Sequence, residues 1–178
     1  MKWSYFVEGK DELAERVTSN ISELKLMDKT FKYIRCDKDG ENQVLKNYFI
    51  KKEIKNVKVE FSTPGTSQQN GVVERAFAFL YDRIRAMLNQ AGVKNSMQSR
   101  MWVECAQTEV SIDNILIKDK KCNYEKFMGY VPKMWHELRN FGEMVVTKNH
   151  KDKLKAKLDD RGNVGIFVGY EEDHAAEA

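Results

Sequence analysis

Residues 63–88 constrain the fold most, because they combine a loop with the most regular helical pattern in the chain. Pro64 and Gly65 interrupt regular structure, and a hydroxyl of Thr66 or Ser67 can then cap a helix. Apolar residues follow at helical spacing. They predict one buried stripe made of Val73, Ala76, Phe77, Leu80, Ile84, Met87 and Leu88.

Glu74 lies one turn beyond this loop, on the same flank of the predicted helix as Asn70, Tyr81 and Arg85. One interpretation is a surface carboxylate that the helix dipole favours near the N-terminus. The other is a ligand of a functional site. Gly71 costs about 1 kcal/mol relative to Ala in a helix, and it allows a ligand or another backbone to come close.

Asp37 follows a predicted strand over residues 31–36. Carboxylates at the carboxyl ends of strands often carry the chemistry of α/β sheets, although an Asx turn explains such an aspartate equally simply. A helix and a strand are predicted between Asp37 and Glu74. We therefore expect both carboxylates at one sheet edge, about 4 to 8 Å apart, where they would bind a divalent cation such as Mg²⁺.

Several ordered motifs resemble the integrase catalytic core of Copia-type (Pseudoviridae) retrotransposon Pol polyproteins. They are RCDKDGE, TPGTSQQNGVVER, IRAMLNQAG, YEKF, LRNFG and GIFVGY, together with Trp102, Asn114, Gly129 and Pro132. The resemblance extends from Trp3 to Tyr170. It implies an α/β fold that is a partial ribonuclease-H-like (retroviral integrase-like) fold with a small C-terminal α+β extension. Residues 1–118 would form a truncated catalytic core and residues 119–178 the extension.

The resemblance also implies DNA integration by two-metal chemistry, with Asp37 and Glu74 as catalytic residues and metal ligands. In the family, a first aspartate lies on a strand upstream of the position of Trp3, and this chain lacks it. Mg²⁺ or Mn²⁺ would then be weakly held, if at all, and the isolated chain would be inactive. Asp39 occupies the place of a family glycine, so it is a poor replacement.

DNA is the expected partner. The nucleic-acid-binding residues inferred from the motifs and the basic stretch are Lys38, Gln69, Asn70, Arg75, Arg85, Lys151, Lys153 and Lys155. Residues 148–157 form either a phosphate-binding track or a solvated loop. Ala78 replaces a basic family residue, which neutral drift or decay of the copy explains. The alternative function is a non-catalytic nucleic-acid-binding or protein-interaction module derived from an integrase.

Composition indicates a globular chain, with 178 residues, 42% hydrophobic, 32% charged and a net charge of +3. No apolar run approaches 18 residues, so we expect no membrane partner. Cys36, Cys105 and Cys122 lack metal-binding spacing and predict free thiols in a reducing compartment, either nuclear or cytoplasmic. A homo-oligomer is possible.

The remaining patterns predict further elements. Helices are expected over residues 10–26, 41–53 and 97–117, with a helical turn over 124–129. Strands are expected over residues 3–7, 57–61, 144–147 and 164–168, and residues 118–123 read as a charged linker.

Overall fold

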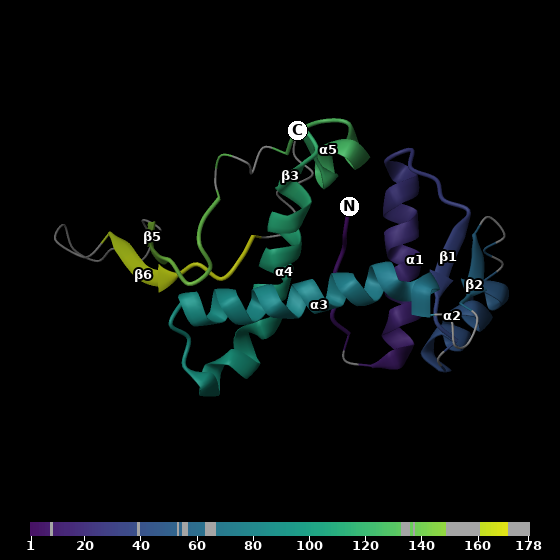
Figure 1. Ribbon diagram of the computed structural model, residues 1–178, viewed down its shortest axis with the longest axis horizontal. Helices are drawn as coiled ribbons and strands as arrows, with labels where there is room; N and C mark the ends of the chain where they lie inside the picture. The colour runs from purple at the N-terminus through teal and green to yellow at the C-terminus, as the bar shows by residue number, and fades with distance from the viewer. Residues whose placement is uncertain are drawn as a thin grey trace. The chain divides into compact units, whose positions relative to one another are not determined.

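The computed structural model describes residues 1–7, 9–38, 40–52, 54, 57–62, 67–132, 136, 138–148 and 161–170. The chain divides into two compact units, which are considered separately. One comprises Tyr5–Phe77, and the other comprises Met1–Ser4 with Ala78–Ala178 (Figure 1). In the described residues, no helix has both the length and the apolar character needed to cross a membrane.

The unit Tyr5–Phe77 is built on a two-stranded parallel sheet. Helix α1 (Lys10–Leu26) precedes the first strand, β1 (Tyr33–Cys36). Helix α2 (Gly40–Lys51) connects β1 to the second strand, β2 (Lys58–Phe61), and helix α3 (Ser67–Gln90) follows β2. Tyr33 pairs with Lys58 and Cys36 with Phe61. A parallel pair needs a crossover, and α2 provides it. The predicted helices over residues 10–26 and 41–53 and the strands over 31–36 and 57–61 are confirmed, with small changes at their ends.

The core of this unit lies between α1 and α2. Ala14 and Ile21 of α1 pack with Leu45 and Phe49 of α2 and with Val57, just before β2. These positions follow the helical period of each sequence, which brings one stripe of each helix onto the core. Val44, the residue before Leu45 in α2, is 44% exposed, because the helical turn carries it beyond the edge of that stripe.

The predicted strand over residues 3–7 is wrong, since the structure shows no regular element there. The backbone of Lys2 is instead bonded to a side chain: its N–H donates to Asn114 Oδ1 and its carbonyl accepts from Asn114 Nδ2, both at 2.7 Å. The ring of Trp3 packs edge-on against Phe127, with centroids 5.3 Å apart. Contacts with side chains therefore take the place of the backbone hydrogen bonds that a strand would make. Among the described residues, the sheet of the other unit contains only β1 and β2.

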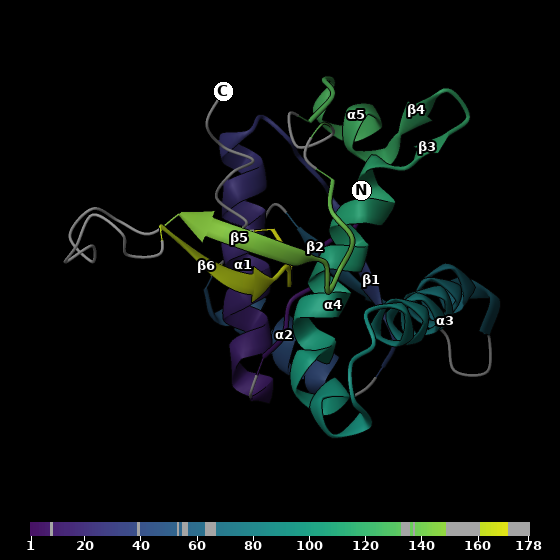
Figure 2. The ribbon, with the colours of Figure 1, turned by 90° about the vertical axis from the view of Figure 1, so that its left-hand side faces the viewer.

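The other unit pairs the second half of α3 with α4 (Asn95–Ile115). Beyond α4 come a hairpin of β3 (Ile117–Lys118) and β4 (Lys121–Cys122), helix α5 (Asn123–Met128), and an antiparallel pair of β5 (Met144–Lys148) and β6 (Gly162–Ile166). Figure 2 shows the β3–β4 hairpin and α5 beside one end of α4. The predicted helix over 97–117, the helical turn over 124–129 and the last two strands are confirmed.

The predicted linker over residues 118–123 is wrong, because this segment is the β3–β4 hairpin. Asp119 and Lys120 form its two-residue turn with positive φ angles of 54° and 75°. A tight hairpin turn of this kind requires two residues with positive φ. Asp119 is a usual first residue of such a turn, whereas Lys120 lies where glycine is usual. Cys122 then caps α5, since its Sγ accepts a hydrogen bond from the Glu125 N–H at 3.2 Å.

The predicted apolar stripe of α3 is correct only in its second half. Ile84 and Leu88 are buried against Cys105, Ala106 and Phe141. Two earlier members of the stripe, Val73 and Phe77, are each 52% exposed. Helical periodicity identifies which residues share a face, but a face is buried only where another element packs onto it.

Candidate functional site

Asp37 lies where the sequence predicts it, directly after β1 and before α2. Its side chain is exposed, and Oδ1 accepts a hydrogen bond from Asn42 Nδ2 in the first part of α2. This bond ties the carboxylate to α2, and among the described residues Oδ2 has no hydrogen-bond partner. The hydrogen bond of Asp37 is therefore between two side chains, and it is not the backbone contact of an Asx turn.

Glu74 lies in the second turn of α3, and its side chain is exposed. Its neighbour Arg75 folds back along the helix, since Nε donates to the Gly71 carbonyl at 3.0 Å. Among the described residues, a Cβ placed on Gly71 would meet nothing within 4 Å, so none of them requires a glycine at this position.

The carboxylates of Asp37 and Glu74 belong to the same unit, and their convergence on one cation stays a prediction. Among the described residues, no group of three His, Cys, Asp or Glu side chains could hold a metal ion. Asp39, the spare carboxylate, lies outside the described residues. Without a third ligand, Asp37 and Glu74 would supply carboxylate oxygens to one hard cation such as Mg²⁺, and water molecules would complete its coordination.

The predicted DNA-binding residues are only partly described. Lys38 is exposed beside Asp37. Arg85 is exposed and forms an ion pair with Asp82, three residues earlier on α3. Gln69 and Asn70 belong to α3 while their side chains lie outside the description. Lys151, Lys153 and Lys155 also lie outside the described residues, as does most of the basic stretch 148–157.

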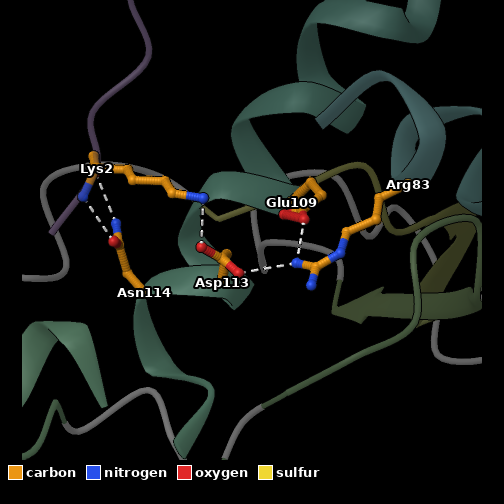
Figure 3. Close-up of polar contacts among 5 residues, drawn as sticks. All are labelled: Lys2, Arg83, Glu109, Asp113 and Asn114. Carbon is orange, nitrogen blue, oxygen red and sulfur yellow. Dashed lines mark hydrogen bonds and ion pairs between the residues drawn. The ribbon is translucent and has the colours of Figure 1, made fainter. Parts of the chain in front are cut away.

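Sequence reasoning missed a charged network in the other unit (Figure 3). Arg83 of α3 reaches two carboxylates of α4, with Nη1 2.6 Å from Glu109 Oε1 and 2.9 Å from Asp113 Oδ1. Lys2 adds a second cation, with Nζ 2.7 Å from Asp113 Oδ2. Asn114 holds the backbone of Lys2 in place. Two cations thus balance two carboxylates that are almost completely buried.

Burial governs the protonation of this network. It raises the pKa of the Glu109 carboxyl, and the hydrogen bond and charge of Arg83 only partly oppose the change. The hydrogen bond to Glu109 in turn raises the pKa of Arg83. Glu109 Oε2 is buried without a hydrogen-bond partner among the described residues. Protonation of Glu109 therefore costs less free energy in the folded chain than protonation of a well-solvated carboxylate does.

One part of this network was visible in the sequence. Glu109 and Asp113 are spaced four apart in α4, so they share a face of the helix. Their partner Arg83 lies 26 and 30 residues away, and only the packing of α3 on α4 brings it there. A cavity of about 400 Å³ adjoins the pair, with Met87, Ile112 and Arg139 among its lining residues.

The three cysteines are free thiols, as predicted. Cys105 and Cys122 are buried, whereas Cys36 is half-buried at the end of β1. Burial raises the pKa of Cys105 to about 11. It also raises the pKa of Cys36, and the neighbouring charge of Asp37 adds to this effect. Thiols with raised pKa values are poor nucleophiles near neutral pH, which fits a packing role.

The chain resembles part of a known polyprotein. Over 187 aligned residues it is 26% identical to the retrovirus-related Pol polyprotein from transposon TNT 1-94 of Nicotiana tabacum. The similarity covers 94% of this chain and 12% of the polyprotein, so the chain spans a small part of that relative's length. This similarity supports a retrotransposon Pol origin. No protein-family profile matches the chain. No solved structure matches it either.

Proposed function

We propose that this chain is a portion of a Copia-type retrotransposon integrase, derived from the catalytic core that joins element DNA to target DNA. The observation that carries the proposal is the similarity to a transposon Pol polyprotein along almost the whole chain. The integrase-like motifs around Asp37 and Glu74 narrow the proposal to one part of such a polyprotein. The ribonuclease-H-like fold is part of the same proposal, and the parallel β1–α2–β2 unit is compatible with it.

In this proposal Asp37 and Glu74 hold Mg²⁺ or Mn²⁺. A bound ion would polarise a phosphodiester and stabilise the charge that develops during in-line attack. The chain's own contribution begins with Asn42, which fixes one oxygen of Asp37 and leaves the other available. Because no group of three His, Cys, Asp or Glu side chains among the described residues could hold a metal ion, a pair of ions would be poorly held and the isolated chain inactive.

DNA strand-transfer assays test this proposal directly. The purified 178-residue chain is incubated with an oligonucleotide that mimics a processed element end, in Mg²⁺ and then in Mn²⁺. We expect no strand transfer, and no difference between the chain and Glu74→Gln. Strand transfer that Glu74→Gln abolishes would refute the inactivity and would direct attention to Asp39.

A second candidate function is a non-catalytic nucleic-acid-binding or protein-interaction module. The observation that favours it is the absence of a three-carboxylate group among the described residues. A Mg²⁺ titration followed by NMR separates the two functions. Shifts confined to the surroundings of Asp37 and Glu74, and lost in Asp37→Asn, favour a retained metal site. DNA binding that is indifferent to Mg²⁺, without such shifts, favours the module.

A further inference from the structure

A groove of about 510 Å³ lies between α2 and β2, within the unit Tyr5–Phe77. Phe49 and Val57 are buried at its floor, and Ile54 is half-buried. Ile50 remains 68% exposed beside them. The groove therefore presents apolar surface that could be removed from water if an apolar side chain entered it.

This groove runs along the edge of β2 that faces away from β1. Lys58 N–H donates to the Lys32 carbonyl and Ser62 N–H to the Cys36 carbonyl, both at 2.8 Å, so these alternate residues face β1. Val59 and Phe61 consequently direct their N–H and C=O groups to the opposite side. Among the described residues, no strand pairs with β2 on that side. Such an edge is a template for an added strand.

The rim of the groove is positively charged. Lys46 of α2 and Lys58 of β2 both line it, and neither forms an ion pair within the described part of the chain. Glu60 also lines it, but its carboxylate is 3.3 Å from the guanidinium of Arg35. The aromatic ring of Phe61 lies 5.3 Å from Lys46 Nζ, at the same edge. Within the described residues, the two lysines at this rim therefore favour the binding of acidic groups.

The charge also argues against self-association. A second copy of the chain pairing through the same edge would bring its own Lys46 and Lys58 to this rim. Like charges at the junction would oppose that pairing, whereas an acidic segment would be attracted. Lysines on edge strands are a common means of preventing edge-to-edge association of identical sheets.

We propose that the α2–β2 groove binds an extended acidic peptide segment of a partner protein by β-strand addition. The backbone of the segment hydrogen bonds to Val59 and Phe61. Its apolar side chains contact Phe49, Ile50 and Val57, and its carboxylates meet Lys46 and Lys58. Main-chain pairing supplies affinity in this mode, while pockets and charges for alternate side chains supply specificity. The inference is independent of any catalytic role of Asp37 and Glu74.

Selection from a displayed library of random 12-residue peptides against the whole chain tests the inference. We expect enriched sequences in which apolar and acidic residues alternate. A synthetic peptide with an enriched sequence should bind at least about tenfold more weakly to the double variant Lys46→Glu/Lys58→Glu. The matched control is Lys25→Glu/Lys51→Glu, which makes the same charge change at exposed positions in the last turns of α1 and α2, outside the groove lining.

Backbone N-methylation of the peptide provides a second readout. Methyl groups on the alternate nitrogens that face β2 should abolish binding, while methyl groups on the other nitrogens should be tolerated. Enrichment of peptides without acidic residues, no enrichment at all, or equal weakening by both double variants would overturn the proposal. So would concentration-dependent dimerisation in sedimentation that Val59→Pro removes, since a second copy would then occupy the edge.

Discussion

Arg83 and Glu109 form an ion pair between α3 and α4, with Nη1 of the arginine 2.6 Å from Oε1 of the glutamate. The same nitrogen also reaches Asp113. Both carboxylates are almost fully buried, whereas the Arg83 side chain is 41% exposed. The pair connects the two longest helices at a point where apolar packing alone would leave two charges unpartnered.

Replacement of Arg83 by Met should destabilise the unit that contains it. Breaking a fully buried pair costs about 3–5 kcal/mol, and the partial exposure of Arg83 reduces our expectation to about 1–3 kcal/mol. Urea unfolding followed by circular dichroism measures the loss. The control Arg85→Met breaks an exposed pair with Asp82 and should change the free energy of unfolding by less than about 0.5 kcal/mol. Equal losses of unfolding free energy in the two variants would show that the buried ion pairs stabilise the chain no more than the exposed pair does.

Stability should depend on the protonation of Glu109. Because its pKa is raised in the folded state, the folded chain binds this proton more tightly than the unfolded chain does. The contribution is fully present below the ordinary pKa of 4.5, and it is lost as pH rises through the raised folded value. Urea midpoints measured across this range for the chain and for Glu109→Gln should diverge with rising pH. Parallel curves would contradict the raised pKa.

Gly142 should be much less tolerant of substitution than Gly129. Both have positive φ angles, 80° and 95°. A Cβ on Gly142 would clash with Ala91 Cβ, while a Cβ on Gly129 would meet none of the described residues within 4 Å. Gly129→Ala should therefore cost about 1–2 kcal/mol from backbone strain alone. Gly142→Ala should cost about 1–3 kcal/mol more, because the neighbouring backbone must shift. Thermal unfolding of the two variants provides the comparison.

DNA binding by the isolated chain should be weak, sensitive to salt and indifferent to sequence. Exposed Lys38 can release counterions from phosphates without any metal. Fluorescence anisotropy with labelled duplexes should show affinity falling steeply between low and physiological salt, with similar values for unrelated sequences. Lys38→Ala should reduce the slope of the logarithm of the binding constant against the logarithm of the salt concentration by about one unit. Binding that ignores salt or prefers one sequence would exclude this mode.

The sequence by itself determined the helices and most strands, because periodicity and turn residues act locally. The stripe of α1 that contains Ala14 and Ile21 was predictable, as was the position of Asp37 directly after a strand. The turn at Asp119 and Lys120 was not, since Lys120 adopts a positive φ at a position where such turns usually carry glycine. Family-like motifs identified the candidate carboxylates without specifying how near to each other they lie.

Tertiary structure alone decided which predicted faces are buried and which charges meet. Val73 and Phe77 continue the stripe of Ile84 and Leu88, yet only the latter pair has a buried environment. Residues 3–7 have the composition of a strand, but a strand needs a neighbour to complete its hydrogen bonds, and Asn114 satisfied the adjacent backbone instead. Arg83 pairs with Glu109, 26 residues further along the chain. Contacts between such distant residues depend on how the helices pack, and no local sequence pattern specifies that packing.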